Sequence, residues 1–438
     1  MTRQKTGPFA LLVLALACVL ASCHVRGSQR SEIPFLKLLE RKSGLISFVA
    51  PDGNVHIIDQ TGARNRALTD DAGPSAGTSV LYTAVTLSPD GRQVAFTRFT
   101  LASDMVTDAS LYIAPARDGG SVRVFTSAWL VPFYLSWSPD SRRISLLSQV
   151  KGESDLELGV SLAGKDQRYV ALDRGAPYYW DWLADSSTIA AHANAQRGGS
   201  AGERLSLISV DPATRRSDLP VQTDLFQAPN ISPDGKSFVY VSGNRDNFDV
   251  HLRRLDGSAE RIIASDAGAA YFALSGDGKH LAYLAALSVQ PVPQGSLTIV
   301  SLEKSSVPAK LTEVPVLAFF WAPDSRKLAF IMPDSSGPVD PMFQSSDNQL
   351  NVRLMGCEAK TGRTWTIARF PATRGLLTIL PFFDQYQRSA TIWSPDSRYT
   401  VFTAISSRNE PAVYVVRADG NTRPRFLTAG DSAFWSRK

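Results

Sequence analysis

The chain has 438 residues, of which 20% are charged, and its formal net charge is +5. This small excess, with no run of Lys or Arg longer than a pair, excludes the basic footprint of a nucleic-acid-binding protein. Only three cysteines are present, and Cys18 and Cys23 lie near the N-terminus, so Cys357 has no partner for an internal disulfide.

Residues 1–22 read as a targeting segment. Arg3 and Lys5 give a positive start, and the apolar run that follows is too short to span a bilayer comfortably. The run ends in Leu20-Ala21-Ser22-Cys23, which resembles the lipobox of bacterial lipoproteins. That resemblance implies cleavage before Cys23 and a thioether from its sulfur to diacylglycerol. The alternative is an ordinary signal peptide in which Cys23 is incidental.

Residues 23–43 are expected to form a lipidated tether. The stretch Ser31-Glu32-Ile33-Pro34 precedes an apolar-rich segment and favours one or two capped helical turns. The same stretch could instead be a strap that packs under the following domain.

A short phrase then returns throughout residues 44–438. It combines Ser or a small residue with Pro-Asp-Gly or Pro-Asp-Ser, often after Trp. Its copies, one of them worn and the last shortened, are Leu87-Ser88-Pro89-Asp90-Gly91, Trp137-Ser138-Pro139-Asp140-Ser141, Trp182-Leu183-Ala184-Asp185-Ser186, Ile231-Ser232-Pro233-Asp234-Gly235, Leu274-Ser275-Gly276-Asp277-Gly278, Trp321-Ala322-Pro323-Asp324-Ser325, Trp393-Ser394-Pro395-Asp396-Ser397 and Phe434-Trp435-Ser436.

Each phrase has the chemistry of a tight turn. Pro presets φ, Asp bonds to the nearby backbone, and Gly accepts a positive φ. Short apolar segments such as 94–97 and 111–114 follow, so the phrase predicts the hairpin between the first two strands of a four-stranded unit.

Such units in radial repetition predict an all-β fold, a β-propeller of eight four-stranded blades. The last phrase stops after one strand and the segment from residue 45 lacks a first strand, so the two ends are expected to complete one blade. Seven blades remain the alternative if the worn copy at Trp182 is not a blade of its own. The widest spacing between phrases, from Ala322 to Ser394, predicts insertions there.

The same residues carry a family resemblance. The phrase followed by an apolar strand, with a later Asp-Gly and Leu-Thr, resembles the repeat of TolB-type propellers, and residues 240–250 are especially similar to a TolB blade. The resemblance covers roughly residues 45–438. It implies the fold but little about function, because such blades serve binding proteins and peptidase side domains alike.

Catalytic chemistry is hard to place in this sequence. Gly159-Val160-Ser161-Leu162-Ala163 is only a near miss to a nucleophile elbow and lies in an expected strand. The histidines have no metal-ligand spacing, and Cys357 falls in an expected third strand, where a lone Cys is usually a small buried hydrophobe. No cofactor or metal is therefore expected.

Aromatic residues gather in the segments that lead into each first strand and in the widest insertion. In a propeller these connections converge on one face, where loops commonly bind partners; the alternative is that they fill the wedges between blades. The candidate binding residues are Trp129, Tyr178, Tyr179, Trp180, Arg374, Phe382, Phe383, Asp384 and Tyr386.

The sequence thus predicts a lipid-anchored, extracytoplasmic propeller at the bacterial cell envelope. Its expected role is non-catalytic: a protein-binding or scaffolding module with an envelope protein as partner, attached to the membrane by its lipid, without nucleic acid and as a monomeric ring. One alternative is a ligand-sensing or solute-binding subunit. The other is a hydrolase or lyase that acts on glycans or peptides at the channel face.

Overall fold

The computed structural model describes residues 43–103, 105–117, 119–164, 168–194, 203–210, 214–223, 225–288, 292–303, 309–312, 315–337, 339–344 and 349–438. The predicted leader, Cys23 and all of the tether except Ser43 lie outside these residues. Within the described part of the chain, no helix is long and apolar enough to cross a membrane.

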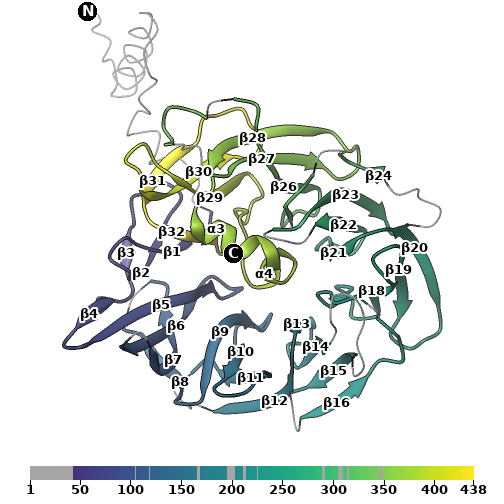
Figure 1. Ribbon diagram of the computed structural model, residues 1–438, viewed down its shortest axis with the longest axis horizontal. Helices are drawn as coiled ribbons and strands as arrows, with labels where there is room; N and C mark the ends of the chain where they lie inside the picture. The colour runs from purple at the N-terminus through teal and green to yellow at the C-terminus, as the bar shows by residue number, and fades with distance from the viewer. Residues whose placement is uncertain are drawn as a thin grey trace, which may run out of the picture. The chain divides into compact units, whose positions relative to one another are not determined.

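The described residues form a closed ring of eight antiparallel blades, A to H in chain order (Figure 1). Blades A to D contain β1 (Ile46–Val49), β2 (Val55–Ile58), β3 (Arg66–Ala67) and β32 (Asp431–Trp435); β4 (Gly73–Ser75), β5 (Thr78–Leu87), β6 (Gln93–Ala102), β7 (Met105–Pro115) and β8 (Val122–Ser127); β9 (Leu130–Trp137), β10 (Arg143–Val150), β11 (Leu156–Leu162) and β12 (Tyr169–Gly175); and β13 (Tyr178–Trp182), β14 (Thr188–Ala193), β15 (Arg204–Ser209) and β16 (Arg215–Asp218).

Blades E to H contain β17 (Asn230–Ile231), β18 (Ser237–Gly243), β19 (Phe248–Arg254) and β20 (Glu260–Asp266); β21 (Ala269–Leu274), β22 (His280–Ser288), β23 (Gln294–Ser301) and β24 (Ala309–Lys310); β25 (Ala318–Trp321), β26 (Lys327–Pro333), β27 (Asn351–Glu358) and β28 (Thr364–Pro371); and β29 (Tyr399–Ile405), β30 (Pro411–Arg417) and β31 (Arg425–Ala429). A single bridge from Trp393 to Thr400 stands for the innermost strand of blade H. The worn phrase at Trp182 ends β13 and belongs to a blade of its own, so the prediction of eight blades is confirmed.

The two ends of the ring close on each other as predicted. β32 is the innermost strand of blade A and pairs with β1, with Ile46 opposite Trp435 and Ser47 opposite Phe434. The Leu45 N–H also donates to the Ser436 Oγ at 2.9 Å. In other blades the corresponding bond joins the phrase to the start of the strand that follows it, for example from the Arg143 N–H to the Ser138 Oγ at 3.0 Å. The last strand therefore completes a turn motif whose second half comes from the start of the ring.

Hydrogen bonds within each turn explain why the phrase repeats. In blade C the Ser138 hydroxyl donates to the Asp140 carboxylate at 2.6 Å, and that carboxylate accepts the Arg142 N–H at 3.0 Å. The same Ser–Asp bond recurs in blades B, E, F and H. Each Asp is thus used by its own turn and is not part of a carboxylate pair.

The phrase also joins neighbouring blades. In four blades the indole N–H of its Trp donates to a carbonyl in the innermost strand of the preceding blade, as from Trp393 to Phe320 at 3.0 Å. In five blades the hydroxyl of a Ser two or three residues before the second strand accepts the Asp N–H of the preceding blade's turn, as Ser325 does from Asp277 at 3.0 Å. We call these bonds the Trp staple and the Ser staple.

Three blades cannot make either staple. Blades B, E and F have Leu or Ile in place of Trp, and Gly in place of the stapling Ser. The seams that precede them, A/B, D/E and E/F, therefore depend on side-chain packing and on other bonds. At the E/F seam the Asn230 side chain supplies one, by donating to the Phe272 carbonyl at 3.0 Å.

Candidate functional site

The widest insertion forms a helical plug inside the ring. It contains α3 (Arg374–Ile379), the 3-10 turn η1 (Leu380–Phe382) and α4 (Phe383–Ser389), and Figure 1 shows both α-helices over the centre of the ring. Thr373 caps α3, since its hydroxyl accepts the Leu376 N–H at 3.2 Å and also bonds to the Asp431 carboxylate at 2.8 Å. The cap therefore fixes the start of the plug against β32.

Phe383 holds the plug in place from its centre. Its side chain is completely buried, and its ring lies 5.5 Å from Tyr271, 5.0 Å from Phe319 and 6.3 Å from Phe320, measured between centroids. These partners belong to the innermost strands of blades F and G. Phe383 is thus an inter-blade core residue, which corresponds to the packing alternative.

The other side of α4 bonds to blade D. The Gln385 amide accepts the Trp180 N–H at 3.1 Å and donates to the Trp180 carbonyl at 2.7 Å, so it continues the edge of β13 as a strand would. The Arg388 guanidinium pairs with Asp181 at 2.8 Å and also donates to Asn230 of blade E. The plug therefore ties together blades that lie far from it in the chain.

Tyr386 packs edge-on against Tyr134 of blade C, with ring centroids 5.0 Å apart. The Tyr134 hydroxyl oxygen lies 2.8 Å from the Gln385 carbonyl, to which it donates, and 2.7 Å from the Ser389 Oγ. Burial raises the pKa of both phenols. Both tyrosines therefore act as neutral packing groups that seat α4.

The candidate residues divide by exposure. Trp129, Arg374 and Phe382 are exposed, and Tyr386 is half-buried. Buried positions, with no surface to offer a partner, are taken by Tyr178, Tyr179, Trp180, Phe383 and Asp384. The predicted rim is thus not a continuous aromatic surface, because most of its members pack between blades or under the plug.

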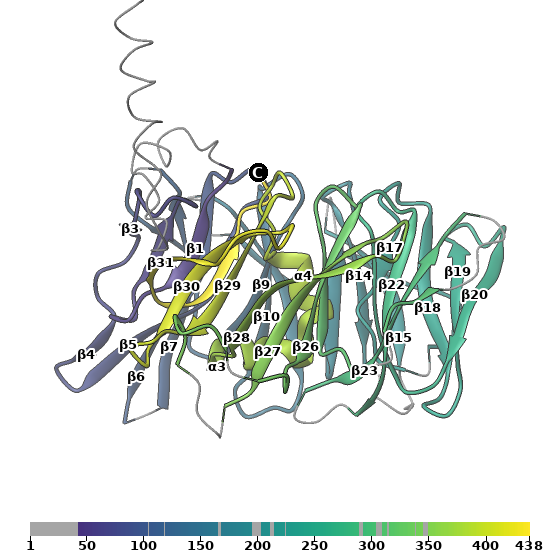
Figure 2. The same ribbon diagram turned by 90° about the horizontal axis from the view of Figure 1, so that it is seen from above.

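Four large apolar side chains remain exposed on blades B and C. We call this set the distal patch; its members are Leu81, Met105, Trp129 and Phe133, exposed by 49%, 69%, 72% and 41%. β5, β6 and β7 are the longest strands among the described residues, with 10, 10 and 11 residues, and they extend at the lower left of Figure 2. Leu81 and Met105 therefore belong to the blade with the longest strands, whereas Phe133 lies in β9 of blade C and Trp129 just before it.

Trp129 is held in place although its side chain is exposed. Its N–H donates to the Ser127 Oγ at 3.0 Å, and its carbonyl accepts the Lys151 N–H at 2.9 Å. The Lys151 ammonium in turn donates to the Val106 carbonyl at 2.9 Å, beside Met105. These bonds fix the loop before β9 against the start of β7 and keep two members of the patch near each other.

The mouth of the channel on the side of the phrase turns is a cavity of about 540 Å³. Arg388, Arg437 and Lys438 line it, and Asp181 is the one acidic side chain among its lining residues in the described structure. Burial raises the pKa of the Asp181 carboxyl against the opposing effect of Arg388 and Arg437. The mouth therefore has an excess of positive charge.

Side chains that could bind a metal or act as acid, base or nucleophile are scattered over the described structure. No three His, Cys, Asp or Glu side chains gather there as a metal-ligating group, and no described histidine lines the mouth of the channel. Cys357 lies in β27, the third strand of blade G, and is fully buried; burial raises the pKa of its thiol to about 12. It is a small core residue, as its place in the sequence indicated.

Comparison with known proteins supports the fold. No family model and no curated protein matches the chain. Among solved structures, TolB from Acinetobacter baumannii is 14% identical, with 81% of each chain covered and a TM-score of 0.39. An oligogalacturonate lyase in complex with manganese is 14% identical, covers 86% of this chain and 97% of its own, and has a TM-score of 0.50. The dihydro-heme d1 dehydrogenase NirN in complex with DHE is 15% identical, covers 100% and 89%, and has a TM-score of 0.52. At these identities the likeness shows the propeller fold alone.

Proposed function

We propose that this protein is a non-catalytic binding module of the bacterial cell envelope, anchored by a lipid on Cys23, and that it docks a partner protein on the distal patch. The observation that carries the proposal is the exposure of four large apolar side chains on two neighbouring blades, with the Trp129 and Met105 segments joined through Lys151. Soluble monomers rarely expose large apolar patches unless they bind something there.

The patch has the composition of an interface centre. Trp and Met are enriched at such centres, and a buried Trp is among the commonest hot spots. At 72% exposed, Trp129 leaves roughly 150 Å² or more for a partner to cover, which is worth about 4 kcal/mol at ~25 cal/mol per Å². Because its loop is already fixed by hydrogen bonds, docking would cost little conformational entropy there.

The partner test compares two surface variants in cells. A Trp129→Ser/Phe133→Ser protein removes two patch members, whereas Phe426→Ser removes an exposed aromatic of β31 on blade H. After crosslinking and purification, a specific partner should be recovered with the native chain and with the control, but not with the double variant. With the purified partner, the double variant should bind at least thirtyfold more weakly. Equal recovery with all three chains would disprove docking on the patch.

The anchor is tested separately. Cys23→Ser protein should move from the membrane fraction to the soluble extracytoplasmic fraction, because a serine oxygen cannot form the thioether. If the Cys23→Ser protein stays with the membrane at the native level, the lipid proposal fails, while the docking proposal stands on its own experiment.

A second candidate function has its own observation. The cavity at the channel mouth is of ligand size and is lined by Arg388, Arg437 and Lys438, so it favours a small anionic solute. Arg437→Gln should then weaken solute binding without any change at the distal patch. A solute screen that finds no ligand whose affinity depends on Arg437 would remove this candidate.

A further inference from the structure

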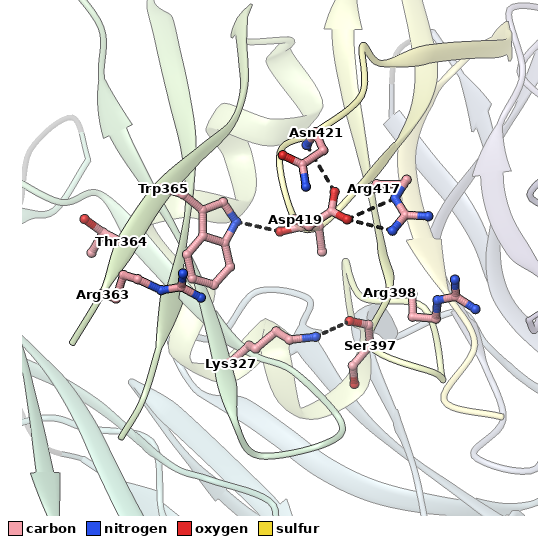
Figure 3. Close-up of a pocket in the computed structure, with 10 residues that line it drawn as sticks. Lys327, Arg363, Thr364, Trp365, Ser397, Arg398, Arg417, Asp419 and Asn421 are labelled. Carbon is pink, nitrogen blue, oxygen red and sulfur yellow. Dashed lines mark hydrogen bonds and ion pairs between the residues drawn. The ribbon is translucent and has the colours of Figure 1, made fainter. Parts of the chain in front are cut away.

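A second cavity lies on the outside of the ring, in the wedge between blades G and H. It measures about 500 Å³, and Figure 3 shows its two walls. Blade G contributes Lys327, Arg363 and Trp365, and blade H contributes Arg398, Arg417 and Asp419, with Asn421 at the edge. We call it the G/H groove; it shares no lining residue with the channel mouth or the distal patch.

The groove carries more positive than negative charge. Four cationic side chains line it, against the single carboxylate of Asp419. Asp419 is already paired with Arg417, through two bonds of 3.1 and 2.7 Å, and this pairing lowers the pKa of its carboxyl. Lys327 lies 3.6 Å from the Asp324 carboxylate and donates to the Ser397 carbonyl at 3.0 Å, so the uncompensated charge of the groove rests mainly on Arg363 and Arg398.

Two of these cations have weak or no acidic partners. The Arg363 guanidinium is 75% exposed and lies 3.9 Å from the Glu358 carboxylate, at the limit of an ion pair. Arg398 makes its hydrogen bonds through its backbone N–H, to Ser394 and Asp396, and its guanidinium has no ion pair with any described residue. Both are therefore available to an anionic ligand.

Trp365 adds an aromatic surface to this charge. Its indole N–H donates to the Ala418 carbonyl at 2.7 Å, and the Arg363 guanidinium lies 5.7 Å from its ring centre. A Cβ on Gly356 would come within 2.3 Å of the indole, whereas one on Gly420 would first meet the Thr366 carbonyl at 2.2 Å. Gly356 thus leaves the space in which the indole lies, and the bond to Ala418 fixes its orientation in advance.

The other seams show that a propeller blade can pack against its neighbour without an indole at this position. At three of them an arginine near or in the fourth strand donates to a carbonyl at the end of the neighbouring blade's third strand: Arg66 to Pro115, Arg261 to Leu302 and Arg425 to Gln60. Trp365 makes the corresponding bond at the G/H seam. An arginine would satisfy the same carbonyl, so the aromatic face is an addition specific to this groove.

We propose that the G/H groove binds an anionic saccharide, with a sugar ring against Trp365 and its acidic groups on Arg363, Arg398 and Lys327. Sugar rings present apolar C–H faces that pack on indoles, and Arg binds carboxylate and phosphate groups through paired N–H donors. The shared chemistry is a sugar unit bearing a carboxylate or a phosphate ester. This proposal does not depend on the proposed partner docking.

The test titrates the purified full-length protein with four probes by calorimetry. They are a uronic-acid tetrasaccharide, a phosphorylated tetrasaccharide, neutral maltotetraose and inorganic phosphate. At least one anionic saccharide should bind ten times more tightly than both the neutral saccharide and inorganic phosphate. The stronger of the two anionic probes identifies the acid group, and its affinity should fall as salt rises. Equal affinity for maltotetraose, or for phosphate alone, would overturn the proposal.

Two variants locate the site. Trp365→Gln keeps an N–H donor for the Ala418 carbonyl and adds no charge, but removes the aromatic face; we expect a loss of about tenfold for the anionic saccharide. Arg363→Gln/Arg398→Gln removes two exposed cations without touching the core and should also cost about tenfold, with a weaker salt dependence. If the Trp365→Gln protein does not fold, the double arginine variant decides alone. Native affinity in the double arginine variant would overturn the assignment.

Discussion

The plug makes a sharp prediction about two adjacent phenylalanines. Phe383 is completely buried against three aromatic rings, whereas Phe382, one residue earlier, is 48% exposed. Phe383→Ala removes a whole ring from a packed site and should lower the free energy of unfolding by about 3–5 kcal/mol. Phe383→Leu keeps most of the volume and should cost about 1–1.5 kcal/mol. Phe382→Ala should cost under ~1 kcal/mol, because its side chain loses little burial.

The measurement is guanidinium unfolding of the four proteins, monitored by tryptophan fluorescence and by hydrogen exchange of the α4 amides. Phe383→Ala should lower the midpoint most and should also speed exchange in α4, since the helix is held to blades F and G by that ring. If Phe382→Ala destabilises the ring as much as Phe383→Ala, the plug is not held as we argue. A combined change at Phe382, Phe383 and Tyr386 would therefore test stability before it tested any partner.

Three further predictions concern single side chains. Hydrogen bonds from Ser336 and two arginines outweigh the effect of burial and hold the pKa of the Asp334 carboxyl well below its usual value. The carboxylate should therefore stabilise the fold above about pH 4 and lose this contribution as the pH falls further. In urea unfolding, the destabilisation caused by Asp334→Asn should shrink between about pH 5 and pH 2. Ser325→Ala deletes one Ser staple and should cost about 1 kcal/mol in the same assay, whereas an unchanged midpoint would show that the staple adds nothing to the seam. The Cys357 thiol, buried and with its pKa raised to about 12, should resist a thiol reagent at pH 8 until the ring unfolds; rapid labelling of the native protein would contradict its place in the core.

The sequence analysis did not single out Trp365 of the G/H groove, although the sequence contains a signal for it. Three seams place an arginine where blade G has Trp365, and that exchange is visible once the units are aligned by their phrases. Gly356 had no such signal, because only the β27–β28 pairing places it directly opposite Trp365, and Gly420 had none because it approaches the indole only when blades G and H pack together. The sequence also indicates which seams can carry the staples, because Trp and the stapling Ser occur together in some phrases and are replaced by Leu or Ile and by Gly in others.

The sequence by itself determined the repeat, the eight blades and the closure of the ring. Those features rest on turn chemistry within six or seven residues, such as the Ser138–Asp140 bond, and on a pattern of strands that each copy repeats. Only the tertiary structure decided where the widest insertion goes. Phe383 meets residues more than 60 positions away in the chain, and Gln385 bonds to Trp180 about 200 positions away. Which aromatic is buried and which is exposed depends on these distant partners, and no local pattern records them.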